Sequence, residues 1–98
     1  MRDNDIIAAI ATATGRSAIG IIRISGPNID VILNKYAPSI RPRRATLVDF
    51  CDDKHKKIDS VIMIYYKSPH SYTGEDLLEI QTHGNPIILN KIINILCP

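Results

Sequence analysis

Hydrophobic and polar positions divide the chain into five apolar runs typical of strands and two periodic segments typical of helices. The runs are short and rich in β-branched residues, as buried or half-buried strands are. They cover residues 6–11, 18–25, 44–51, 58–67 and 76–83. The polar stretch 52–57 lies between two of these runs and predicts a hairpin.

Two segments repeat their apolar residues with helical spacing. The first helix is predicted by apolar residues at i, i+3, i+4 and i+7, namely Ile29, Ile32, Leu33 and Tyr36. The second helix covers residues 87–96, after Asn85 as candidate N-cap and Pro86 at the first helical position. It is apolar around most of its circumference, so we expect cover from the sheet and also from a partner chain or a further domain.

The predicted order is strand, strand, helix, three strands and a final helix. This order is typical of an α+β fold, with a mixed, mostly antiparallel sheet and helices packed on it. The chain has 98 residues, of which 45% are hydrophobic and 22% are charged. These values are ordinary for a soluble globular protein and predict a single domain over residues 1–98.

Several functional classes are excluded by the sequence. No apolar run approaches ~18 residues and the N-terminus does not resemble a signal peptide, so no membrane segment is expected. Cys51 and Cys97 form neither a disulfide framework nor a zinc site, and they favour a reducing compartment. No metal ligands and no catalytic residues are predicted, because the histidines and cysteines are not linked by any known spacing.

Basic residues form two clusters, although the net charge of the chain is only +2. The clusters consist of Arg41, Arg43 and Arg44, and of Lys54, Lys56 and Lys57. Two solvated loops are the simpler interpretation. An RNA-binding surface is the alternative, which the small net charge and the few aromatic residues make weaker.

Two charged residues interrupt predicted strands and are the main candidates for a binding site. Arg23 lies within an isoleucine-rich run, and Glu79 lies between Leu78 and Ile80. Such charges are solvated, paired with each other, or in contact with a ligand. As ligand contacts, a carboxylate suits an N–H/NH₂ edge such as that of a pterin or guanine. A guanidinium suits a carboxylate or phosphate, and folates carry both kinds of group.

The segment before the strand at 76–83 is the other candidate feature. Gly74 permits a tight turn, and Tyr72 and Thr73 precede it. This segment is either a plain turn into the strand or a loop that shapes a binding site.

Two motifs resemble a known family. Residues 20–26 (GIIRISG) and 71–84 (SYTGEDLLEIQTHG) are similar to the N-terminal domain of the MnmE (TrmE) family of tRNA modification GTPases. The opening residues 5–12 (DIIAAIAT) resemble the start of that domain as well. The resemblance covers essentially the whole chain, and the second motif is long and specific.

The resemblance implies a fold similar to folate-binding aminomethyltransferase-type domains, homodimerisation and a cytoplasmic location. It also implies a bound tetrahydrofolate derivative (5-formyl- or methylene-tetrahydrofolate), contacted by Arg23 and Glu79. The full-length family members act with an FAD-dependent partner, MnmG (GidA). Together they add a carboxymethylaminomethyl-type group to C5 of the wobble uridine in tRNA. GTP, Mg²⁺ and K⁺ bind a GTPase domain that is absent from this sequence, so this chain alone is expected to be non-catalytic.

The sequence departs from the family pattern in two places. Residues 13–18 read ATGRSA, where the family usually has Pro-Pro-Gly-Arg-Gly-Gly. A third folate contact of the family, a lysine, follows the second helix and is not in this sequence. An alternative interpretation is therefore a dimerisation module that serves assembly only and binds no ligand in this form.

Overall fold

The computed structural model describes residues 7–10, 19–27, 29–68 and 75–97, with side chains from residue 10 onward. Within these ranges the predicted order of elements is confirmed, and each bound lies within two residues of its prediction. The strands and helices are β1 (Ile7–Ile10), β2 (Ile19–Ser25), α1 (Ile29–Tyr36), β3 (Thr46–Cys51), β4 (Lys57–Tyr66), β5 (Leu77–His83) and α2 (Pro86–Leu96).

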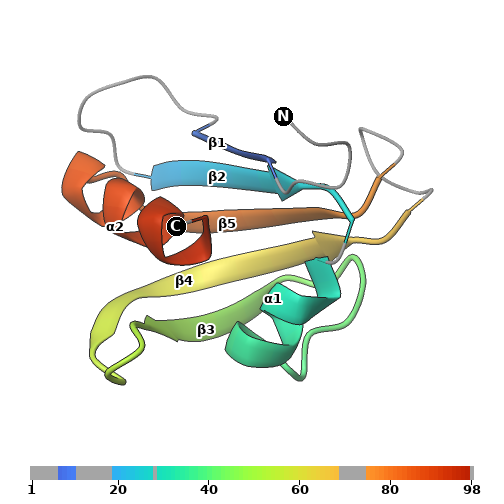
Figure 1. Cartoon of the computed structure of the whole chain (residues 1–98), viewed down its shortest axis with the longest axis horizontal. Coiled ribbons are helices and arrows are strands. Elements are labelled where there is room, and N and C mark those ends of the chain that lie inside the picture. The colour runs from blue at the N-terminus through green and yellow to red at the C-terminus, as the bar shows by residue number, and fades with distance from the viewer. Residues whose placement is uncertain (1–6, 11–18, 28, 69–74, 98) are drawn as a thin grey trace.

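The five strands form one sheet in the order β1-β2-β5-β4-β3. Each pair of neighbours is antiparallel, so the α+β class is confirmed and the sheet is more regular than the mixed sheet predicted. Between described residues, the one parallel pairing is an isolated bridge from Pro42 to Tyr65. β5 is the last of the five strands along the chain, but it lies at the centre of the sheet, between β2 and β4 (Figure 1).

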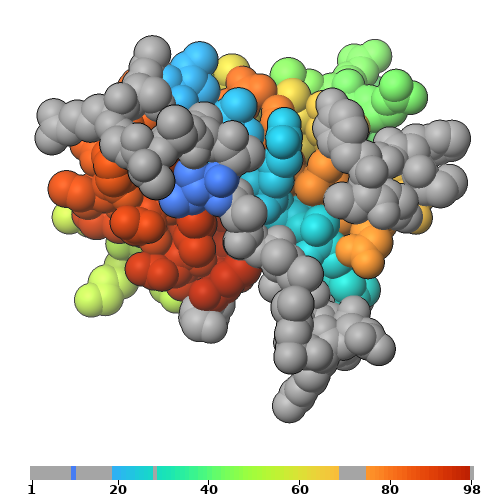
Figure 2. Space-filling model, turned by 90° about the horizontal axis from the view of Figure 1, so that it is seen from above, coloured from blue at the N-terminus to red at the C-terminus, as the bar shows by residue number. Residues whose placement is uncertain are grey.

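The two helices pack on the same face of the sheet (Figures 1 and 2). The hydrophobic core lies between them and the sheet. Alternate residues of β2, β3, β4 and β5 point into it. Its fully buried side chains include Ile22 and Ile24 of β2, Phe50 of β3, Val61 and Met63 of β4, and Leu78 and Ile80 of β5. From α1, the predicted stripe is buried at Ile29, Ile32 and Leu33.

α2 begins as the sequence predicts. The side chain of Asn85 accepts a hydrogen bond of 2.9 Å from the backbone N–H of Ile87, and Pro86 follows it. The helix lies close against β2, because a Cβ atom at Gly20 would come within 2.7 Å of the Leu89 side chain. Glycine at position 20 therefore permits this approach.

The sheet covers most of the apolar surface of α2. Leu89, Ile92 and Leu96 are buried, and three partly buried isoleucines of the helix also pack against the core, namely Ile88, Ile93 and Ile95. Ile87, which is 63% exposed, is the one isoleucine or leucine of α2 that remains mostly in solvent. The need for cover from outside the chain is thus smaller than the sequence suggested.

Candidate functional site

The face of the sheet opposite the two helices, here called the outer face, carries the candidate site. The register brings its residues into rows that cross the strands. Arg23 of β2 and Ile64 of β4 lie on either side of Glu79 on β5. The next row contains Ile21, Gln81, Ile62 and Leu47. Gln81 of the central strand is therefore bordered by aliphatic residues of both neighbouring strands, whereas Glu79 has Arg23 on one side and Ile64 on the other.

Arg23 and Glu79 form an ion pair on this face. Nε of Arg23 donates to Oε1 of Glu79 at 3.2 Å, and Nε2 of Gln81 donates to Oε2 at 3.0 Å. The pairing interpretation of these two charges is confirmed. The ion pair is compatible with a contribution of either residue to a ligand site, which stays a prediction.

The carboxylate of Glu79 is buried although it is not part of the helix-covered core. Its side chain is 10% exposed, whereas that of Arg23 is 45% exposed. A buried charge is tolerated when it is paired and hydrogen-bonded, as here. A carboxylate offers roughly four acceptor positions, and the bonds from Arg23 and Gln81 use one on each oxygen. As far as the described residues show, Glu79 thus keeps capacity to accept further N–H donors.

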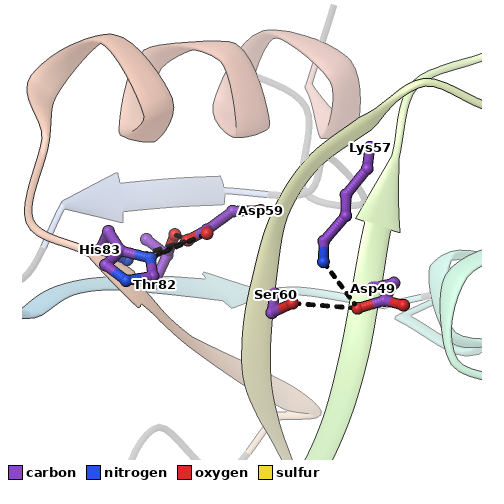
Figure 3. A network of polar contacts seen from close by, with 6 residues as sticks. All are labelled: Asp49, Lys57, Asp59, Ser60, Thr82 and His83. Carbon is purple, nitrogen blue, oxygen red and sulfur yellow. Dashed lines mark hydrogen bonds and ion pairs between the residues drawn. The ribbon is translucent and has the colours of Figure 1, made fainter.

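A second polar cluster lies where β5 leads into α2 (Figure 3). The carboxylate of Asp59 accepts hydrogen bonds from the Thr82 hydroxyl and, at 3.0 Å, from the backbone N–H of His83. Nδ1 of the His83 ring lies 2.8 Å and 2.9 Å from the two oxygens of Asp59. The side chain of Asp59 is 10% exposed and that of His83 is 71% exposed.

These contacts lower the pKa of Asp59. Burial acts in the opposite direction and is the largest single influence, but the hydrogen bonds from the His83 backbone, the Thr82 hydroxyl and the His83 ring together outweigh it. Asp59 therefore binds His83 as a carboxylate and fixes the orientation of its ring. Nothing in the spacing of Asp59 and His83, 24 positions apart, reveals this pair from sequence.

A hollow of about 220 Å³ opens on the outer face between these two polar clusters. Its apolar walls come from three strands, at Ile19, Ile62 and Leu47. Its polar lining consists of Ser60, Gln81, Thr82 and His83. Gln81 lines the hollow and also donates to Glu79, so one side chain links the hollow with the Arg23–Glu79 pair.

None of the remaining sequence candidates within the described residues lines this hollow. Tyr72, Thr73 and Gly74 lie outside the described residues. The two basic clusters flank opposite ends of β3, so they do not merge into one patch (Figure 1). Cys51 and Cys97 are unpaired, partly buried thiols, and burial raises the pKa of Cys97.

Within the described residues, the structure contains neither a candidate metal site nor a candidate membrane span. No group of three or more histidine, cysteine, aspartate and glutamate side chains there is arranged to hold a metal ion. No helix among those residues is both long and apolar enough to cross a membrane.

Comparison with known proteins places the chain. Residues 6–98 match the family model described as the GTP-binding protein TrmE N-terminus. The chain is 46% identical over 95 residues to a tRNA modification GTPase MnmE of Janthinobacterium sp. (strain Marseille), covering 93% of this chain and 20% of that protein. It is also 46% identical over 94 residues to a tRNA modification GTPase MnmE of Nitrosomonas eutropha, covering 95% and 21%.

These relatives are much longer than this chain, which spans about a fifth of their length. The match nevertheless extends over nearly all of the chain and includes every strand and helix described above. The chain therefore belongs to the family of the TrmE (MnmE) N-terminus, the N-terminal domain of tRNA modification GTPases.

Proposed function

We propose that this chain is the reduced-folate-binding and homodimerisation domain of a tRNA modification GTPase. The observation that carries the folate proposal is the buried carboxylate of Glu79, held by Arg23 and Gln81 on the outer face rather than in the core. A buried carboxylate with unused acceptor positions is suited to a ligand that presents two adjacent N–H groups. The amino-pyrimidine edge of a pterin has this pattern.

In this proposal the two charged residues have different tasks. Glu79 accepts the N–H groups of the pterin of a tetrahydrofolate derivative, such as the 5-formyl or methylene form. Arg23 holds Glu79 in place through Nε, and its half-exposed side chain brings a positive charge near the acidic folate. The residues present thus fit the donor and acceptor groups of this cofactor.

The activity of the whole protein is proposed from the tRNA modification GTPases that the chain resembles and from the family resemblance of its motifs. We infer that a longer, cytoplasmic protein containing this domain hydrolyses GTP, with Mg²⁺ and K⁺ in its GTPase domain. With the FAD-dependent MnmG partner it would add a carboxymethylaminomethyl-type group to C5 of wobble uridine in tRNA. The chain described here would supply the folate and the dimer contact, and the GTPase chemistry would occur elsewhere in that protein.

Replacement of Glu79 by glutamine tests the folate proposal. Titration of 5-formyltetrahydrofolate into the chain by calorimetry is expected to show micromolar binding. Glu79→Gln is expected to weaken it by about 10- to 100-fold, because hydrogen bonds to a charged acceptor contribute ~1.5–3 kcal/mol. Asp53→Asn is the matched control, since Asp53 is 79% exposed and pairs only with Lys35 among the described residues.

Two results would contradict the folate proposal. Absence of binding by the unmodified chain would leave no ligand for the site. Equal affinities of the unmodified chain and the Glu79→Gln variant would remove Glu79 from it.

A module that serves assembly alone is the second candidate function, and an observation on α2 favours it. Ile87, at the start of α2, is 63% exposed, and Ile88 and Ile95 of the same helix are only partly buried. Apolar side chains of α2 that the sheet leaves incompletely covered are suited to contact with a second copy of the chain.

Sedimentation equilibrium tests the dimer contact. The chain is expected to form a concentration-dependent dimer, and Ile87→Glu is expected to shift it to monomer, because the substitution places a charge in an apolar contact. Val31→Glu on α1 is the control, since Val31 is also exposed, at 65%. A monomer at high concentration for the unmodified chain would contradict both the proposed dimer and the assembly-only alternative.

A further inference from the structure

A groove of about 330 Å³ lies between α2 and the turn that joins β3 to β4, and it shares no lining residue with the hollow on the outer face. Its apolar lining consists of three half-buried isoleucines, Ile58 of β4 and Ile88 and Ile95 of α2. Its polar lining consists of Asp52, Lys56, Lys57 and Lys91. The volume is near the lower limit for small-molecule sites, so the groove suits side chains inserted by a larger partner better than a whole small ligand.

The lysines of this groove carry more positive charge than the nearby carboxylates compensate. Nζ of Lys57 lies 3.4 Å from Oδ1 of Asp49, a side chain that is 67% exposed. Lys56 and Lys91 are exposed, and neither forms an ion pair with a residue that the structure describes. A partner with carboxylates at both positions would therefore gain two ion pairs without breaking one.

The turn that carries Lys56 is held in one conformation by Asp52. Oδ1 of Asp52 accepts hydrogen bonds from the backbone N–H groups of Lys54 and Lys56, each at 2.9 Å. The backbone N–H of Asp52 donates to the carbonyl oxygen of Lys56, also at 2.9 Å. These bonds occupy part of the carboxylate that would otherwise repel an acidic partner, and they fix the backbone from which Lys56 projects.

The α2 side of the groove repeats with helical spacing. Ile88, Lys91 and Ile95 are at positions i, i+3 and i+7, so they lie along one side of the helix. The stripe is about 10 Å long, since a helix rises about 1.5 Å per residue. A second helix with apolar residues at the same spacing covers this length in two turns.

We propose that this groove binds an acidic amphipathic helix of a partner protein. Apolar residues of that helix pack on Ile58, Ile88 and Ile95, and its carboxylates pair with Lys56 and Lys91. This inference goes beyond the proposed function and does not depend on folate binding or on the homodimer.

Two other occupants fit the groove less well. RNA would meet the lysines, but aliphatic side chains give its bases no aromatic surface on which to stack. A second copy of the chain has the same net charge of +2, and a symmetric contact over the groove would bring the same lysines together. Ile87 does not line the groove, so it stays available for the proposed dimer contact.

Fluorescence anisotropy with a synthetic peptide tests the inference. The probe is a helix-forming peptide of about 15 residues with leucine at i, i+3 and i+7 and glutamate on both flanks. It is expected to bind the chain with micromolar affinity, and more weakly as the salt concentration rises, because the ion pairs are exposed. A second peptide with the leucines replaced by alanine is expected to bind at least about 10-fold more weakly, because it buries less apolar surface.

Reversal of charge in the groove tests which residues bind the peptide. Lys56→Glu and Lys91→Glu are each expected to weaken binding by about 3- to 10-fold, since each replaces an attraction with a repulsion. Lys54→Glu is the matched control, because Lys54 is exposed in the same turn but does not line the groove. A peptide with lysine in place of glutamate is expected to bind the Lys56→Glu/Lys91→Glu variant more tightly than the unmodified chain, which a loss of folding could not produce.

Several results would overturn the inference. Absence of peptide binding, or equal weakening by Lys54→Glu, would remove the groove as the site. Equal affinities of the leucine and alanine peptides would reduce the contact to charge alone. Tighter binding of a single-stranded RNA of equal charge, weakened by Lys56→Glu and Lys91→Glu, would assign the surface to RNA. A change of the dimer equilibrium by Lys91→Glu in sedimentation would assign the groove to a second copy of the chain.

Discussion

Phe50→Ala is expected to destabilise the chain by about 3–5 kcal/mol, the usual cost of truncating a fully buried phenylalanine. Phe50 is completely buried on β3. Its ring stacks on Tyr36 of α1, with 4.9 Å between the ring centroids. The substitution removes apolar contacts, leaves a cavity and separates α1 from the sheet. Because small domains are stable by only ~5–15 kcal/mol, a loss of this size approaches the whole stability.

Urea denaturation, followed by circular dichroism, measures this effect. Leu47→Ala is the control, since Leu47 lies on the same strand but is 74% exposed on the other face. It is expected to change the free energy of unfolding by less than about 0.5 kcal/mol. Similar losses for Phe50→Ala and Leu47→Ala would contradict the assignment of the two faces of the sheet.

Asp59→Ala is expected to reduce the free energy of unfolding by about 2–4 kcal/mol at neutral pH, because it leaves the buried Thr82 hydroxyl and a backbone N–H without their acceptor. The Thr82 hydroxyl and the His83 backbone N–H both lose their partner. The exposed His83 ring is rehydrated by solvent and contributes little to the loss. Asp49→Ala is the control, since its carboxylate is 67% exposed and surface pairs contribute less than about 1 kcal/mol.

The contribution of Asp59 is expected to depend on pH in a defined direction. Its folded-state pKa is lowered below the ordinary value of 3.8. A lowered pKa means that the stabilisation is complete above the unfolded-state value and is lost as the pH falls below 3.8 through the folded-state pKa. The stability difference between the unmodified chain and Asp59→Ala should therefore shrink in acid. A difference that stays constant or grows below that pH would contradict the role of the ionised carboxylate.

The sequence predicts the elements of this fold well because their patterns are local. The stripe of α1 and the start of α2 at Asn85 and Pro86 depend on residues within one or two turns. The strand alternation at 76–83 likewise placed Leu78 and Ile80 in the core and Glu79 on the other face. The order of the strands in the sheet was not predicted, because strand pairing is determined by contacts between distant residues.

The candidate site was predicted in part for the same reason. Arg23 and Glu79 stood out because each is a charge within an apolar strand. Their pairing was one of the open alternatives, and it follows from the register of β2 with β5. Asp59 was missed, because its position at the start of β4 is unremarkable until β4 and β5 are aligned. The hollow was missed too, since its aliphatic walls come from three separate strands.

The central place of β5 has a consequence for how the chain reaches its fold during synthesis. Until residues 77–83 are available, β1 and β2 can pair with each other, and β3 can pair with β4, but no strand joins the two halves. Two-stranded units of this kind have little stability alone. A ribosome must therefore release β5 before the five-stranded sheet can form. Glu79, Gln81 and His83, the polar residues of β5, reach their places in that same late step.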